Sequence, residues 1–89
     1  MDFKKSTRDG KKYMVMTPSK KWIHFGDIKS EQYRDTTGLG LYTHLNHNDK
    51  KRQASYLARA KGIKNKKGDL TWKDKNSANY FSVKFLWMG

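Results

Sequence analysis

The segment from residue 77 to the C-terminus is the most densely apolar part of this sequence, and it limits the folds that the chain can adopt. Its apolar side chains are Tyr80, Phe81, Val83, Phe85, Leu86 and Trp87. Asn76 or Ser77 can cap a helix that begins here, and the helix has too many apolar positions to leave more than one face to solvent. We expect this helix to hold the main core or else to dock on another protein. The docking side chains would then be Tyr80, Phe81, Phe85 and Trp87.

The rest of the chain has little apolar surface to add to that helix. Its 89 residues make one small domain, only 35% of them are hydrophobic, and no cysteine is present to form a disulfide or a thiolate zinc site. Aromatic residues, which make up 13% of the chain, must therefore supply most of the burial. Because no Gly/Ser-rich or Pro-rich linker divides the sequence, we expect one domain over residues 12–89. A basic arm over residues 1–11, anchored only by Phe3, precedes it.

Two β-prone runs follow this arm. Residues 12–17 and residues 21–25 are separated by a turn at Pro18, and Gly26 ends the second run. This arrangement predicts a β-hairpin. Residues 27–47 show no sustained hydrophobic period, although Gly38 and Gly40 mark turns, so their arrangement is not predicted.

A second helix is predicted over residues 50–61. Asn48 or Asp49 can cap its beginning, and Gly62 can end it. A face of small residues would let this helix pack closely on its support: Ala54, Leu57, Ala58 and Ala60. Together these elements predict a small α+β domain in which an N-terminal hairpin is followed by two helices.

The net charge is the strongest indication of the partners of this protein. Twenty Lys and Arg residues stand against eight Asp and Glu residues, which gives +12 at pH 7. Such a charge attracts nucleic acid, anionic lipid or an acidic protein surface. Between Lys50 and Lys75, lysine outnumbers arginine by eight to two, which favours nonspecific attraction to phosphate over bidentate reading of bases.

Aromatic side chains are interleaved with this basic stretch, where Tyr56 and Trp72 can stack on bases or ribose. A solvated charged surface without a partner is the plainer interpretation of the same pattern. The candidate residues for binding nucleic acid or an acidic partner are Lys50, Lys51, Arg52, Arg59, Lys61, Lys64, Lys66, Lys67, Trp72, Lys73 and Lys75.

Patterns that could indicate catalysis or metal binding are weak. His44, His47 and Asp49 lie close in sequence, but a metal site would need a further ligand such as His24, so a polar loop leading into a helix cap is the favoured interpretation. Asp27 and Lys29 have the spacing of some metal-dependent nucleases, without the acidic partner on a paired strand. We therefore expect no enzyme activity, metal, cofactor or small-molecule substrate.

Membrane insertion and secretion are not expected either. No stretch approaches the roughly 20 apolar residues that span a bilayer, and the start of the chain lacks the apolar run of a signal peptide.

Several short segments, in this order and spacing, resemble a known protein family. They are Lys20-Lys21 with Ile23-His24-Phe25-Gly26, Tyr42-Thr43-His44, Asp49-Lys50-Lys51-Arg52, Tyr56-Leu57-Ala58-Arg59, and Ser77-Ala78-Asn79-Tyr80-Phe81-Ser82 with Leu86-Trp87. Over residues 12–87 the chain is similar to small basic proteins encoded by giant and large double-stranded DNA viruses, including those of algae and amoebae. The family often has a histidine after the Tyr-Leu-x-Arg unit, where this chain has Ala60, so a catalytic role of that histidine could not apply here.

The resemblance implies a virion component, present in the virion and in the host cytoplasm or nucleus during assembly. Its expected partners are other capsid proteins and double-stranded DNA. We therefore expect a minor structural protein of a viral shell. The alternative is a nonspecific DNA-binding protein that condenses the genome, and a third hypothesis is a small nuclease that depends on His44 or His47.

Overall fold

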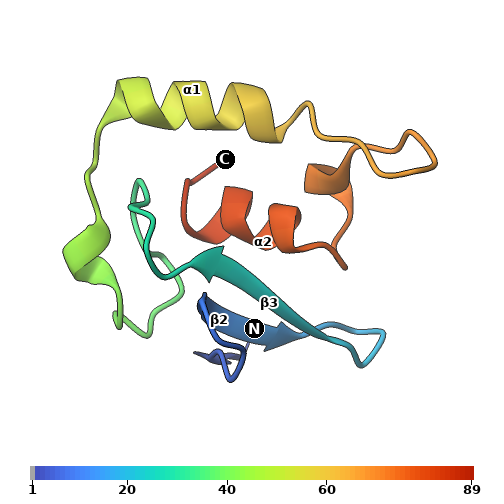
Figure 1. Ribbon diagram of the computed structural model, residues 1–89, viewed down its shortest axis with the longest axis horizontal. Coiled ribbons are helices and arrows are strands. Elements are labelled where there is room, and N and C mark those ends of the chain that lie inside the picture. The colour runs from blue at the N-terminus through green and yellow to red at the C-terminus, as the bar shows by residue number, and fades with distance from the viewer. Residues whose placement is uncertain (1) are drawn as a thin grey trace.

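The computed structural model describes residues 2–89 and places a three-stranded antiparallel sheet beneath two helices (Figure 1). The predicted α+β fold with two later helices is confirmed. The strand order is β1-β2-β3, and α2 lies between the sheet and α1. In chain order the elements are β1 (Phe3–Lys5), β2 (Lys11–Met16), β3 (Trp22–Asp27), the 3-10 turn η1 (Thr43–Leu45), α1 (Lys50–Ala60), the 3-10 turn η2 (Thr71–Lys73) and α2 (Ala78–Phe85).

The hairpin of β2 and β3 forms the centre of the sheet. Tyr13 pairs with Phe25 and Val15 pairs with Ile23 across the two strands. Since successive side chains of a strand point to opposite faces, Tyr13 and Val15 share one face, and both are fully buried together with Phe25. This apolar face packs against α2.

The expectation of a free arm over residues 1–11 is wrong for residues 3–5, which form the edge strand β1. Phe3 pairs with Val15, and its ring lies 4.6 Å from the ring of Phe85 and 5.8 Å from that of Phe25, measured between centroids. One aromatic side chain and the backbone hydrogen bonds of the ladder therefore hold the segment in place. Met1, the first residue of the predicted arm, lies outside the described residues.

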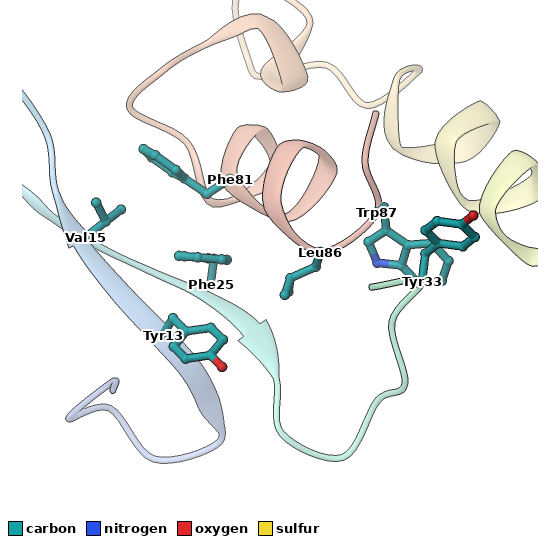
Figure 2. Packing of buried hydrophobic residues seen from close by; sticks show 7 residues of the cluster. All are labelled: Tyr13, Val15, Phe25, Tyr33, Phe81, Leu86 and Trp87. Atoms are coloured by element: carbon teal, nitrogen blue, oxygen red, sulfur yellow. The ribbon is translucent and has the colours of Figure 1, made fainter. Parts of the chain in front are cut away.

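The terminal helix α2 holds the main core, as one of the two alternatives predicted. Ser77 caps it, because its Oγ accepts a hydrogen bond from the backbone N–H of Tyr80 at 3.1 Å. Figure 2 shows how the cluster closes between this helix and the sheet. Its buried members are Tyr13, Val15, Phe25, Tyr33, Phe81, Leu86 and Trp87.

Docking on a partner is a wrong prediction for Phe81 and Trp87. Both side chains are buried inside the domain, because a chain with so few apolar residues needs them for its own core. Tyr80 and Phe85 are partly buried and pack against the same cluster. Each fully buried side chain of this kind contributes about 1.5–3 kcal/mol to stability.

The helix α1 is attached to this core through a few long side chains. Asp49 caps it, with Oδ1 accepting from the backbone N–H groups of Lys51 at 2.9 Å and Arg52 at 3.2 Å. The ring of Tyr56 stacks on that of Trp87 with centroids 4.0 Å apart and planes within 7° of parallel. In addition, Gln53 Nε2 donates to the backbone oxygen of Trp87 at 2.9 Å.

The predicted close packing of α1 through small residues is only partly correct. Ala60 is 3% exposed and Leu57 is partly buried, but Ala54 and Ala58 face solvent. The stacked rings of Tyr56 and Trp87 stand between α1 and the rest of the domain. The helix is therefore held away from its support instead of lying flat on it.

Buried polar groups organise residues 28–47. Lys12 Nζ donates to the backbone oxygen of Ser30 at 2.6 Å and to Gln32 Oε1. The fully buried amide of Gln32 in turn donates to the backbone oxygen of Tyr42 at 2.8 Å and to Asn46 Oδ1 at 2.7 Å. Because these groups lose their hydration on burial, each needs a hydrogen-bond partner. These hydrogen bonds determine the conformation of the loop.

Gly26, opposite Lys12 in the sheet, has to be a glycine. Its φ of +79° is unfavourable for other residues, and a Cβ there would lie 3.0 Å from Leu86 Cδ1 and 3.1 Å from Lys12 Cδ. The residue thus lets the Lys12 side chain and the end of α2 approach the strand closely.

Candidate nucleic-acid interface

A groove of about 920 Å³ separates α1 from the end of the sheet. One wall is the side of α1 that carries Lys51, Ser55 and Arg59. The other wall is formed by the ends of β2 and β3 and by the loop after them, and residues of α2 and Trp87 form the floor. We call this concave surface the α1 groove. The stacked rings of Tyr56 and Trp87 join α1 to the chain after α2 and both line this groove.

Positive charge dominates both walls of the α1 groove. Six basic side chains line it against two acidic ones, Asp27 and Glu31, which leaves a net of +4. Glu31 Oε1 lies 3.0 Å from Arg52 Nη1, but both side chains are about half exposed, so this ion pair adds little stability. The six cations are Lys11, Lys12, Lys29, Lys51, Arg52 and Arg59.

Lys12 differs from the other five because its side chain is 1% exposed. Desolvation by burial lowers the pKa of Lys12 to about 8, and the nearby Asp27 and Asp35 carboxylates oppose part of that effect. At pH 7 the ammonium group is therefore still mostly charged. It contributes to the potential of the groove from beneath, while its hydrogen bonds to Ser30 and Gln32 keep it a structural group.

The floor of the groove is aromatic and well fixed. Tyr56 and Trp87 both line the groove, and burial raises the pKa of the Tyr56 hydroxyl. Nearby, Asn79 Nδ2 donates to the backbone oxygen of Ala60 and to Thr71 Oγ1, both at 2.8 Å. These bonds tie α1, α2 and η2 together, so the α1 wall is fixed relative to the floor.

A second cationic site surrounds Trp72. The ammonium groups of Lys61, Lys73 and Lys84 lie 4.8, 5.5 and 5.8 Å from the centroid of its ring. These lysines come from the end of α1, from η2 and from α2 respectively. The electron-rich face of the indole attracts each cation, which offsets part of their mutual repulsion. We call these four residues the Trp72 cluster.

Nine of the eleven predicted binding residues lie in three places. Lys51, Arg52 and Arg59 line the α1 groove, while Lys61, Trp72 and Lys73 belong to the Trp72 cluster. The loop between α1 and η2, at the right of Figure 1, carries exposed lysines at positions 64, 66 and 67. Two further exposed lysines lie in neither site: Lys50 and Lys75.

Four cations of the two sites were not among the predicted residues. Lys11, Lys12 and Lys29 come from the sheet and the loop after it, and Lys84 comes from α2. The stretch from Lys50 to Lys75 could be predicted because its positive charges are dense in the sequence. The sequence has no comparable signal for lysines that come close to this stretch only in the folded protein.

Two of the three histidines, His24 and His47, make local hydrogen bonds. His47 Nδ1 accepts from the backbone N–H of Asp49 at 2.9 Å, and the ring lies 5.1 Å from that of Trp87. Burial and then the neighbouring Arg52 lower the pKa of His47. His24 Nδ1 is hydrogen-bonded to Ser6 Oγ at 2.7 Å. Within residues 2–89, no three His, Asp or Glu side chains gather in a way that could hold a metal ion.

None of the helices over residues 2–89 has the length and apolar character required to cross a membrane.

Comparison with known proteins gives one partial match. A family model described as a family of unknown function (DUF5754) matches residues 1–37. The match spans the three strands and the start of the following loop, so it includes Lys11, Lys12 and Lys29 of the α1 groove but none of α1. No curated protein and no solved structure matches the chain.

Proposed function

We propose that this protein binds nucleic acid through the phosphate backbone, without reading the base sequence. The observation that carries the proposal is the lack of internal charge pairing. Of the 20 Lys and Arg side chains, all within the described residues 2–89, one lies within ion-pair distance of a carboxylate. Apart from the buried Lys12, the other positive charges have no carboxylate partner and are available to an external polyanion.

The shape of the α1 groove supports this choice of polyanion. Cations stand on both walls, and the floor between them includes the aromatic ring of Tyr56. A phosphodiester chain carries a charge at every nucleotide and releases bound counterions when lysines neutralise it, which favours association. Four of the six groove cations are lysines, which act as point charges on phosphate and lack the forked geometry of arginine.

The role of a minor shell protein, inferred from the resemblance to viral proteins, remains a prediction. An acidic protein surface could also be attracted by the charge of +12. Such a surface presents scattered carboxylates, whereas the groove lines up cations along two facing walls. This arrangement favours a linear polyanion as the ligand.

The test is binding of the purified protein to a labelled duplex of scrambled sequence at several salt concentrations. We expect a dissociation constant of about 1–100 μM at physiological salt, and an affinity that falls with a log–log slope of about −0.9 per phosphate contacted. A duplex of different base composition should bind equally well. Weak binding with a shallow slope would contradict the proposal and would assign the charge to an acidic protein partner.

A matched pair of double variants tests the groove itself. Lys51→Gln with Arg59→Gln removes two exposed cations from its wall, so affinity should fall and the magnitude of the salt slope should decrease by about 2. Lys20→Gln with Lys21→Gln removes the same charge from the exposed turn between β2 and β3. Equal losses in both variants would show that net charge, and not the groove, determines binding.

A further inference from the structure

The α1 groove and the Trp72 cluster face in opposite directions. On α2, the groove is lined by Ala78, Asn79 and Ser82, whereas Lys84 lies two residues beyond Ser82. Each residue of an α-helix turns the side chain by about 100°, so Lys84 points about 200° away from Ser82. The helix therefore presents its groove side and its cluster side to nearly opposite surfaces of the molecule.

The helix α1 gives the same result independently. Lys51, Ser55 and Arg59 are spaced by four residues, which places them in one stripe along the groove. Lys61 follows Arg59 by two residues with right-handed helical backbone angles, so it too points about 200° away from that stripe. Both helices thus place the Trp72 cluster on the side of the α1–α2 pair that is turned away from the groove.

The cluster is also preorganised for an anion. Asn79 holds Thr71, next to Trp72, and the end of α1 through its two hydrogen bonds, so the backbone that carries Trp72 is tied to both helices. Three ammonium groups are then held around one ring, and none of them lies within ion-pair distance of a carboxylate in the described chain. A phosphate group placed among them would relieve their mutual repulsion.

From these observations we infer that the protein is bivalent: the α1 groove holds one segment of nucleic acid, and the Trp72 cluster holds a second segment on the opposite side. The inference rests on the proposed function and adds bridging to it. A straight segment lying in the groove cannot also reach a site that faces away from it. Because the smallest extent of the molecule is 21 Å, two bridged segments would lie close together, with the +12 charge between them to offset their repulsion.

A two-duplex capture assay tests the bridging. One scrambled duplex is fixed to beads through biotin, and a second, fluorescent duplex of the same length is added in solution. Wild-type protein should retain the fluorescent duplex on the beads. Lys61→Gln with Lys84→Gln should still bind a single duplex through the groove. Its capture of the second duplex should fall by about tenfold or more at 0.1 M salt, since each lost phosphate contact costs about that factor.

The matched control is again Lys20→Gln with Lys21→Gln, which has the same net charge and should retain capture close to wild type. Undiminished capture by the Lys61/Lys84 variant would overturn bivalency, and so would an equal loss in the control. Bivalency would also be overturned if light scattering showed that the free protein self-associates and capture rose only with that self-association. If the wild type binds one duplex but captures no second one, bridging fails while the proposed function stands. Absence of all binding would remove both.

Discussion

The body formed by the sheet and α2 differs sharply from α1 in how it is held together. In the body, Tyr13, Phe25 and Phe81 are fully buried, and the ring centroid of Phe25 lies 6.0 Å from that of Tyr13 and 5.7 Å from that of Phe81. In α1, Ala60 is the single residue classed as buried, and the helix rests on the stack of Tyr56 with Trp87. The body therefore supplies stability, whereas α1 positions charge.

We expect the largest loss of stability when a buried side chain at the centre of the body is removed. Phe81→Ala leaves a cavity between α2 and the sheet, and we expect a loss of about 3–5 kcal/mol in the free energy of unfolding. This is a large share of the roughly 5–15 kcal/mol available to a domain. Urea denaturation followed by circular dichroism measures the change. A loss below about 1 kcal/mol would show that Phe81 is not at the centre of the core.

Detaching α1 should have a smaller and more local effect. Tyr56→Ala removes the stacked ring, and we expect a cost of about 2–3 kcal/mol from lost burial and ring contact. Hydrogen exchange should accelerate over residues 50–60, while the amides of β2 and β3 keep their protection. Tyr56→Phe is the control, because it keeps the stack and should exchange like the wild type. Uniform acceleration in both regions would mean that they unfold together.

The body should also become more stable as pH rises above 8, because of Lys12. Its pKa is lowered to about 8 in the folded protein from the usual 10.5, so above pH 8 the unfolded chain binds the proton more tightly than the native state does. The free energy of unfolding should therefore rise by about 2 kcal/mol between pH 8 and pH 10.

Lys12→Met is the matched comparison for that titration. It lacks the titrating group, so its stability should show a flatter dependence on pH over the same range, whatever its absolute value. Denaturation curves at half-unit steps of pH measure both proteins. Equal slopes would show that the ammonium of Lys12 is hydrated in the folded state.

The smallest effect is expected on the outer face of α1. Ala58 is exposed, so Ala58→Gln should change the free energy of unfolding by less than about 0.5 kcal/mol. Close packing through small residues, as the sequence pattern suggested, would instead make this substitution costly. Thermal unfolding of the variant beside the wild type separates the two.

The elements that sequence reasoning found are those with local signals. Asp49 and Ser77 are helix caps, and each makes its capping hydrogen bonds within three residues of itself. The hairpin follows from two β-prone runs and the turn between them. The dense apolar pattern around Phe81 identified the core helix for the same reason, because its composition is visible without knowing the fold.

The features that were missed depend on contacts between distant residues. The strand β1 is fixed by Phe3 meeting Phe85, and the loop after β3 is shaped by the buried bond between Lys12 and Gln32. Neither partner can be identified from its neighbours in the chain. The α1 groove is a further case, since Lys29 and Arg59 share its lining only after the helix has been placed.

The setting of Trp72 makes this side chain an optical reporter. Of the three tryptophans, Trp22 is 41% exposed and Trp87 is 8% exposed in the core, whereas Trp72 has three ammonium groups around its ring. The electric field at an indole shifts its emission wavelength. A ligand bound at those lysines should therefore change the fluorescence of Trp72, whereas a ligand in the α1 groove would act on Trp87, which lines that groove. A Trp22→Phe variant removes the emission of the exposed tryptophan. Its remaining fluorescence would report occupancy of the Trp72 cluster without an added dye.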